Sequence, residues 1–414
     1  MTLLKMKLLA ASFLLTQIAN TATATSITLP SNDTTGINRN MPGQVSFVPG
    51  IGTNGKYAPG STNHFSFNVI GGDNGGVDGF ELGTIFNINR QHVQSAQIAG
   101  IFNQVGGRVQ GFQIAGIFNR VQQSMTAVQL AGITNLVGGP VKGVQVAGVF
   151  NEVQQSVNGA QISGVANIAK GPLTGIQITG VYNQLTDSLN GTQVAGITNI
   201  VNGPVKGIQI SGIASVARKE VNGVQIAGIV NYAKNLKGVQ IGLVNIADST
   251  SGYSIGLINI SPQSFYRVAV YANEMMNTNV AFKSGTPRIY GILLSGANFS
   301  NDKKMYSFGA GIGKEFSLGK SKMFTLNPEL TSQYLYTGTW TFENTLNRIQ
   351  ANVHVKLGKY VSVFAGPAFS VLHSDQDVAT TGYKLHPVSS NYHVFKLWDN
   401  TTAWFGWNAG ITIF

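Results

Sequence analysis

One short motif recurs along the middle of the chain at an almost fixed interval. The unit G-x-Q-[apolar]-small-G-[apolar]-x-N returns between Gly79 and Ile260, and most of its successive glutamines are 16 positions apart. A fixed period over so many copies means that one supersecondary unit is duplicated and packs against its own copies. The repeats generate two polar rows, which are Gln97, Gln113, Gln129, Gln145, Gln161, Gln177, Gln193, Gln209 and Gln225, and Asn103, Asn119, Asn135, Asn151, Asn167, Asn183, Asn199 and Asn231.

Within each repeat, polar and apolar residues alternate with a period of two. Between positions 109 and 121, one parity carries Gln113 and Asn119 among small residues, and the other carries an apolar band that includes Phe112 and Ile114. Alternation over 13 residues, interrupted by glycine every few positions, predicts a β-strand and disfavours a helix. The chain is therefore predicted to be all-β in this region.

The tips between the predicted strands alternate in kind, which raises the period from 16 to 32 residues. Gly-Pro tips such as residues 138–140 and 170–172 interleave with polar tips such as residues 122–124 and 154–156. An antiparallel meander places successive turns at opposite ends of a sheet, which explains two kinds of tip. A β-solenoid with 32-residue coils, in which Gln and Asn ladders stack from coil to coil, is the alternative, and a simple 16-residue coil explains the alternating tips less well.

Composition and the first residues indicate an exported protein. Only 10% of the 414 residues are charged, against about 25% in average soluble domains, and cysteine is absent. Residues 1–24 have the basic start, apolar run and small-residue site of a signal peptide. We interpret residues 25–62 as a flexible segment, 63–260 as the repeat region and 261–414 as further barrel strands.

Membrane insertion, if it occurs, is expected to use strands. No later stretch reaches the roughly 18 consecutive apolar residues of a membrane helix, so a closed β-barrel is the remaining means of crossing. The net charge of +11 comes from scattered residues, and no nucleic-acid partner is predicted.

The residues after Ile260 have the pattern of outer-membrane barrel strands. About eight alternating strands are expected between Ser264 and Phe414, with His354 and Lys356 facing a lumen. Tryptophan is favoured at membrane interfaces because an apolar ring with a polar edge fits there. The predicted interface aromatics are Trp340, Trp398, Trp404 and Trp407.

Units such as Gly207-Ile208-Gln209-Ile210-Ser211-Gly212, followed by strands that end at Phe414, resemble bacterial surface-repeat proteins of Gram-negative groups. The resemblance covers the repeat region, and a more distant likeness is to the head repeats of trimeric autotransporter adhesins. It implies a location in the outer membrane or at the cell surface. The C-terminal part looks like a generic outer-membrane barrel, whose terminal Phe414 resembles the signal read by the barrel assembly machinery.

No catalytic or cofactor-binding pattern emerges. His373, Ser374 and Asp375 are adjacent in sequence, but three neighbours in one loop cannot form an oriented triad, so a barrel hydrolase is only a third option. Residues 73–78 are interpreted as a turn because the spacing of a calcium loop is missing. No catalytic, metal or cofactor residues are predicted, and the protein is expected not to be an enzyme.

The preferred interpretation is one antiparallel transmembrane barrel of about 20 strands, made of the repeats together with the C-terminal strands. Its Gln- and Asn-lined interior would pass small solutes as a porin does, with a mild preference for anions. The alternative is a β-solenoid followed by a smaller barrel, displayed at the surface for adhesion to a ligand. Both interpretations name outer-membrane lipid and the barrel assembly machinery as partners.

Overall fold

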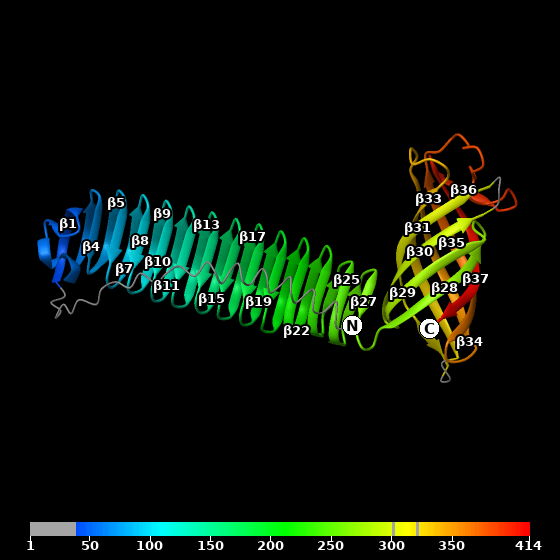
Figure 1. The fold of residues 1–414 in the computed structure, drawn as a ribbon, viewed down its shortest axis with the longest axis horizontal. Helices are drawn as coiled ribbons and strands as arrows, with labels where there is room; N and C mark the ends of the chain where they lie inside the picture. Colours follow the sequence, from blue (N-terminus) through cyan, green and yellow to red (C-terminus); the bar gives the residue numbers. More distant parts are fainter. Residues whose placement is uncertain (1–38, 300–302, 320–322) are drawn as a thin grey trace.

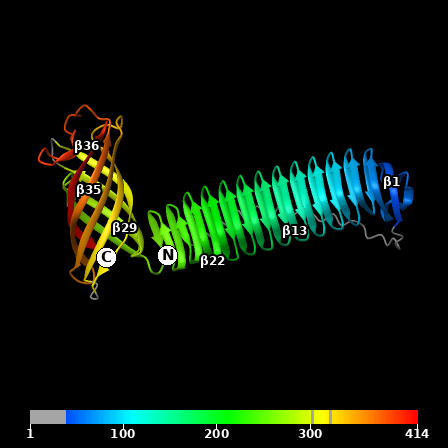
Figure 2. The same cartoon turned by 180° about the vertical axis from the view of Figure 1, so that it is seen from behind.

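Two β architectures follow each other along the chain (Figure 1). The computed structural model describes residues 39–299, 303–319 and 323–414. Residues 39–260 form a long stack of coils, and residues 265–413 form a barrel at one end of it, as Figure 2 shows from behind. The predicted single antiparallel barrel of about 20 strands is therefore wrong, and the alternative of a solenoid followed by a small barrel is confirmed.

The repeats form a parallel β-solenoid with about 12 coils in the described part of the chain. Gln113 pairs in parallel with Gln129, and Asn119 pairs in parallel with Asn135, so that one coil takes 16 residues and the predicted 32-residue coil is also wrong. Most coils contain a seven-residue strand and a four-residue strand. The longer strands are β5 (Gly76–Gly83), β7 (Val93–Ala99), β9 (Val109–Ala115), β11 (Met125–Ala131), β13 (Val141–Ala147), β15 (Val157–Ser163), β17 (Leu173–Thr179), β19 (Leu189–Ala195) and β21 (Val205–Ser211). The shorter strands are β4 (Gly71–Asn74), β6 (Phe86–Asn89), β8 (Phe102–Val105), β10 (Phe118–Val121), β12 (Thr134–Val137), β14 (Phe150–Val153), β16 (Ala166–Ala169), β18 (Tyr182–Leu185) and β20 (Thr198–Val201).

The two ends of the solenoid are less regular. At its start, β1 (Arg39–Val48) pairs in parallel with β3 (Ser61–Asn68), and these strands are joined through β2 (Ile51–Gly52) and the 3₁₀ helix η1 (Gly55–Gly60). Residues 39–62, within the segment predicted to be flexible, therefore belong to the solenoid. Its last coils contain β22 (Ala214–Ala227), β23 (Val230–Leu236), β24 (Val239–Ile241), β25 (Val244–Thr250), β26 (Tyr253–Ile255) and β27 (Ile258–Ile260).

A corner divides what the alternation predicts as one 13-residue strand. Strand β9 ends at Ala115 and β10 begins at Phe118, so Gly116 and Ile117 turn the chain. The corner needs glycine because a Cβ on Gly132 would lie 2.0 Å from the carbonyl oxygen of Gly116 in the preceding coil. The alternation is suspended at the corner, where Gly116 and Ile117 both lie at the surface, and it resumes with the same parity at Asn119; Ile117 consequently points outward with 40% of its surface exposed.

The alternation of tips arises from stacking of neighbouring coils and not from two ends of a sheet. All tips lie on one edge of the solenoid, opposite the glycine corners. A Cβ on Gly139 would lie 2.7 Å from the carbonyl carbon of Gln123 in the previous tip. Up to the tip at residues 202–204, tips with side chains alternate with glycine tips, because glycine leaves room for the backbone of the preceding tip.

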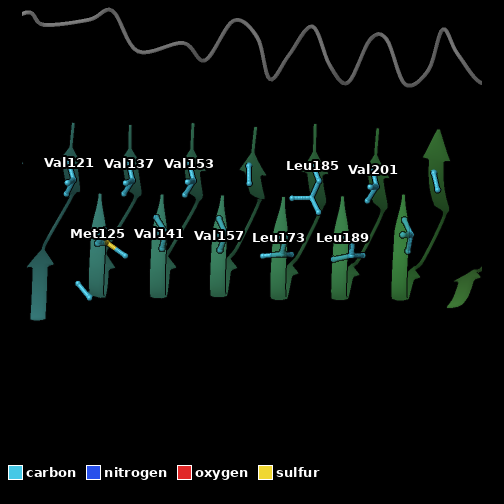
Figure 3. Packing of buried hydrophobic residues seen from close by; sticks show 14 of the residues in the cluster. Val121, Met125, Val137, Val141, Val153, Val157, Leu173, Leu185, Leu189 and Val201 are labelled. Atoms are coloured by element: carbon cyan, nitrogen blue, oxygen red, sulfur yellow. The ribbon is translucent and has the colours of Figure 1, made fainter. Parts of the chain in front are cut away.

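The apolar core of the solenoid lies beneath these tips. Two rows of aliphatic side chains face each other there, one from the longer and one from the shorter strands (Figure 3). Met125 and Leu173 belong to the first row, and Val121 and Leu185 belong to the second; each is at most 1% exposed. Burial of these rows is the main hydrophobic contribution of the repeats to folding.

In the described residues, eight strands close the C-terminal barrel. Strand β28 (Phe265–Asn273) pairs antiparallel with the last strand, β37 (Thr401–Ile413), which completes the ring. The intervening strands are β29 (Thr278–Thr286), β30 (Ile289–Asn298), β31 (Met305–Gly313), β33 (Phe324–Tyr336), β34 (Asn344–Lys356) and β35 (Val361–Ser374), with β32 (Phe316–Leu318) and β36 (Val394–Trp398) as additions. The short connections 287–288 and 357–360 lie at one end, and the long connection 375–400 lies at the other (Figure 1).

The last coils of the solenoid dock against the outer wall of the barrel. Asn259 donates its backbone N–H to Ser284 Oγ at 3.1 Å and its side-chain amide to the Ser284 carbonyl at 3.1 Å. Gly291 is the neighbour of Ser284 in the next strand, and a Cβ there would lie 1.7 Å from the Gly256 carbonyl oxygen. Small residues on the barrel wall thus allow backbone contact with the solenoid.

Among the described residues, no helix is both long and apolar enough to cross a membrane.

The glycine corner predicts a test of coil stacking. In Gly164→Ala, the new Cβ would lie 2.2 Å from the Gly148 carbonyl oxygen, so the coils must separate. We expect the free energy of unfolding to fall by roughly 1–3 kcal/mol in circular-dichroism denaturation. The control is Gly358→Ala, where no atom lies within 4 Å of the added methyl group. Equal stability of the two variants would contradict tight stacking at the corner.

Candidate functional site

The predicted glutamine row forms a continuous ladder inside the solenoid. Each Gln side chain is 0% exposed, and from Gln113 to Gln225 each donates its Nε2 to the Oε1 of the glutamine one coil earlier, at 2.7–3.0 Å. An amide can do this because it carries both a donor and an acceptor. Since the repeats form the solenoid, this row does not line a barrel lumen.

The asparagine row forms a second ladder that runs in the opposite direction. Asn103 donates its Nδ2 to Asn119 Oδ1 in the following coil at 2.9 Å, and also to the Ile114 carbonyl at 2.7 Å. The same pair of bonds recurs along the stack, so each asparagine also satisfies a backbone carbonyl of its neighbour. The two ladders together fix the register of every coil.

Both ladders end on groups that complete their hydrogen bonding. Glu81 occupies the glutamine position of an early coil and is 0% exposed; it accepts bonds from the amides of Asn68, Asn74, Asn89 and Gln97. At the other end, the final asparagine, Asn259, donates to the barrel strand β29. Complete burial raises the pKa of Glu81 above its ordinary value, and the amide hydrogen bonds counteract part of that rise.

The outer surface at the level of the ladders is apolar. Two outward rows contain only isoleucine, valine and leucine over eleven consecutive coils. Ile117, Ile133 and Val165 are typical, with 40%, 44% and 45% of their surface exposed. The row beside the glutamines is Ile98, Ile114, Leu130, Val146, Ile162, Ile178, Val194, Ile210, Ile226, Ile241 and Ile255, and the corner row is Ile101, Ile117, Ile133, Val149, Val165, Val181, Ile197, Ile213, Ile229, Leu243 and Leu257.

Paired charges and polar side chains fill the barrel interior together with two buried apolar clusters. Lys283 pairs with Glu329, which also accepts bonds from Tyr290 at 2.6 Å and Gln350 at 2.7 Å. The space left beside this cluster is a cavity of about 10 Å³, too small for more than a single water molecule.

A second buried cluster surrounds Glu274. Its carboxylate accepts from Arg348 at 2.9 and 3.2 Å, and Arg348 also donates to Asn408. The arginine side chain is 1% exposed and the glutamate 0%. This pair joins strands β34 and β37 to the β28–β29 connection across the barrel, which stabilises one arrangement of the strands.

The residues predicted to face a lumen occupy different environments. His354 is 4% exposed, stacks on Phe364 with ring centroids 4.6 Å apart, and contacts Ser362. Lys356 lies at the end of β34 and is half-buried, with its Nζ 5.8 Å from the Phe414 ring. Their surroundings are side chains and not an aqueous path.

The four tryptophans do not form one belt. Trp404 is 1% exposed inside the barrel, where its Nε1 donates to Glu274 at 3.0 Å. Trp340 is 65% exposed and stacks on Tyr334, and Trp407 donates to the Tyr392 hydroxyl. Trp398 is 71% exposed. Trp340, Trp398 and Trp407 therefore keep an outward position, and Trp404 is a core residue.

The last residue, Phe414, lies at the barrel end that carries the short connections. Its ring packs beneath Arg267 at 4.5 Å, and its backbone N–H donates to the Tyr360 carbonyl. The terminal aromatic is thus held by a cation–π contact.

The elements of a hydrolytic site are held apart by other partners. His373 Nδ1 contacts Thr401 Oγ1 at 3.0 Å, whereas Ser374 donates to Asn344 Oδ1 at 2.5 Å. No cluster of three or more His, Cys, Asp or Glu able to hold a metal occurs among the described residues. Next to these residues, a cavity of about 570 Å³ lies between the barrel rim and the long connection, lined by His386, Tyr392 and Trp404 among others.

Sequence reasoning missed the three acidic residues that organise the interior, which are Glu81, Glu274 and Glu329. Each is an isolated acid in a chain with 10% charged residues, and that scarcity is the available signal. The partners of the two barrel acids lie far away in sequence, as Glu274 and Arg348 do at a separation of 74 residues, and only the folded barrel brings them together. The partners of Glu81 lie within 16 residues of it in the sequence, and the coils of the solenoid bring them to it.

An interrupted ladder predicts a stabilising substitution. Ser215 replaces asparagine in one coil, and Asn231 Oδ1, which would accept from that position, is buried without a hydrogen-bond partner in the described structure. Ser215→Asn should supply the donor and raise the free energy of unfolding by about 1 kcal/mol. Chemical denaturation measures the change, and Ser215→Ala, which has no donor, is the control. Destabilisation of Ser215→Asn relative to the parent would contradict the proposed donor and acceptor order.

The start of the glutamine ladder predicts a pH effect. A carboxyl group whose pKa is raised in the folded state stabilises the fold most when protonated, so its contribution falls as pH rises from about 4.5 through the folded-state pKa. We expect Glu81→Gln to remove this part of the pH dependence, because an amide does not titrate. Thermal unfolding of parent and variant, measured from roughly the ordinary carboxyl pKa upward to about pH 8, tests it. Identical pH profiles would show that Glu81 does not titrate in this way.

Comparisons of the chain with protein families, with curated proteins and with solved structures find no match.

Proposed function

We propose that the protein is a non-enzymatic outer-membrane protein in which the C-terminal barrel is an anchor and the solenoid is a rigid scaffold. The observation that carries this proposal is the closed ring of eight strands in the described residues, apolar outside and filled by paired charges inside. A barrel with this distribution satisfies its backbone groups and presents apolar side chains to lipid.

The outward barrel residues support contact with lipid. Leu293, Phe308, Leu330 and Ile349 lie on successive strands and are 46%, 49%, 50% and 61% exposed. The connections 287–288 and 357–360 and the connection between β31 and β33 lie at the end that holds Phe414, and the longest connection, 375–400, lies at the opposite end, which agrees with the usual arrangement of shorter periplasmic turns and longer extracellular loops. The proposed signal peptide lies in residues 1–24, outside the described residues, and export and assembly through Phe414 belong to the same proposal.

A scaffold fits the barrel better than a solute passage does. Eight strands enclose an interior that side chains are just able to fill. Here the ion pairs Lys283–Glu329 and Arg348–Glu274 occupy it. The solenoid is then the part of the molecule that carries the function. Its resemblance to surface-repeat proteins favours a binding role over a catalytic one.

Cell fractionation and conductance test the proposal. The full chain, produced in a Gram-negative host, should stay in the outer-membrane fraction after alkaline washing and migrate differently on gels before and after heating. Reconstituted in planar bilayers, it should give no stepwise conductance because the barrel is filled. Recovery in the soluble periplasmic fraction would contradict the anchor, and regular conductance steps would favour the porin-like passage instead.

The buried pair in the barrel gives a quantitative prediction. Arg348→Ala leaves Glu274 buried without its cation, and we expect the free energy of unfolding to fall by about 3–5 kcal/mol. The temperature at which heating changes the migration of the protein on gels should fall accordingly. The control is Lys396→Ala, which removes a pair whose side chains are 72% and 98% exposed, and it should have no measurable effect. A similar shift in both variants would show that the buried pair is not what stabilises the barrel.

A further inference from the structure

We propose that the solenoid lies in the membrane as well, with its corner edge among the acyl chains of the leaflet at the short-connection end of the barrel. The solenoid would be a monotopic element: its corner edge enters one leaflet, and its tips stay in the water on that side of the membrane. This inference rests on the proposed function only in that the barrel must cross the same membrane.

The first observation is the inverted distribution of polarity across each coil. A solenoid in water buries apolar side chains and exposes polar ones. Here, at the level of the ladders, Gln113 and Asn119 are 0% exposed, while Phe112 and Ile114 on the outer face are 56% and 36% exposed. Polar groups satisfied inside an apolar exterior are the arrangement that a lipid environment requires.

The second observation is that the opposite edge of the solenoid is polar and basic. In residues 93–260, every charged side chain lies at or near the tips, and none lies in the outward rows around the corner. Nine basic residues face four acidic ones there, a composition that suits anionic phospholipid headgroups. The basic residues are Arg108, Arg120, Lys142, Lys170, Lys206, Arg218, Lys219, Lys234 and Lys237, and the acidic ones are Glu152, Asp187, Glu220 and Asp248.

The third observation concerns depth. The apolar zone of one coil extends from Phe112 to the corner at Ile117, which at about 3.3 Å per residue is roughly 15 Å. The hydrocarbon core of a bilayer is about 30 Å thick, so one leaflet offers about half of that. The apolar zone is therefore deep enough for one leaflet and too shallow to span both.

The contact with the barrel places the two edges at matching heights. Arg288, in the short connection 287–288, donates to the Ser251 carbonyl on the tip edge at 2.8 Å. On the corner edge, Leu243 and Leu257 face the outward barrel residues Ile312 and Leu330 across an apolar cavity of about 450 Å³.

The barrel residues at that cavity lie deeper along the wall than Arg288. Ile312 pairs with Gly291, three positions beyond Arg288, and Leu330 pairs with Ile312. The stack then leaves the barrel sideways at the height of the C-terminus (Figure 1). The corner rows thus continue the apolar band of the barrel, while the tips stay at the height of its short connections.

Because the chain has no cysteine, single-cysteine variants of the full-length protein allow a direct depth measurement. Spin labels are attached to Val165→Cys on the corner edge and to Gln155→Cys on a neighbouring tip, and the protein is reconstituted in vesicles of anionic and zwitterionic phospholipids. Ile349→Cys, on the outward face of the barrel, marks lipid exposure. The collision rates of each label with oxygen and with a water-soluble nickel complex are then compared.

The proposal expects the oxygen-to-nickel collision ratio at Val165→Cys to exceed that at Gln155→Cys several-fold and to approach that at Ile349→Cys. A low ratio at Val165→Cys with a high ratio at Ile349→Cys would overturn the inference and leave the barrel anchor intact. A low ratio at Ile349→Cys would instead contradict the proposed function. Dipolar broadening between labels at Val165→Cys would show that a second copy covers the corner edge, and that result also overturns the proposal.

Discussion

The stacking of identical amides, one coil above the next, is the interaction on which the rest of the molecule depends. A side chain that must accept from one neighbour and donate to the other has to carry both functions, and among ordinary side chains the amides of Gln and Asn do so with fixed geometry. Gln113 therefore sits between Gln97 and Gln129 at 2.8 and 2.7 Å. This requirement fixes the place of Gln and Asn within each 16-residue coil, and the close stacking in turn requires glycine at the corners, where backbones approach most closely.

The ladders also explain why the outer faces are able to be apolar. Once the polar groups are satisfied inside, the outward rows contribute nothing to hydrogen bonding, and isoleucine and valine suit a strand surface. The barrel follows the same arrangement with ion pairs in place of ladders. The two parts meet at Ser284 and Gly291, where the asparagine ladder ends on the backbone of a barrel strand. At the level of the ladders, the solenoid therefore resembles the barrel in that satisfied polar groups lie inside and apolar side chains lie outside.

Much of the fold could be predicted from the sequence, and the errors have identifiable causes. The all-β class, the 16-residue spacing of the motif and the two polar rows follow directly from the pattern, whereas the 32-residue coil inferred from the alternating tips is wrong. The alternation predicted one continuous strand across Gly116 and Ile117, where the chain in fact turns a corner. The corner was missed because its residues are apolar or small, as they would be within a strand. In a meander, Gln would pair with Asn, and in a solenoid Gln pairs with Gln. Both pairings satisfy the hydrogen bonds of the amides, so the two polar rows alone could not distinguish a meander from a solenoid. The buried acids could not be placed, because Glu274 meets Arg348 only after the barrel closes.

The opposite directions of the two ladders have a mechanical consequence. Glutamine amides donate toward the start of the solenoid, where the carboxyl group of Glu81 can accept several bonds, and asparagine amides donate toward the barrel, where a backbone carbonyl accepts the last one. A defect in one ladder therefore leaves the other continuous. At Ser215 the asparagine ladder is interrupted, yet Gln209 and Gln225 remain bonded at 2.9 Å. Two independent ladders keep adjacent coils in register, so that one substitution weakens the stack locally without dividing it.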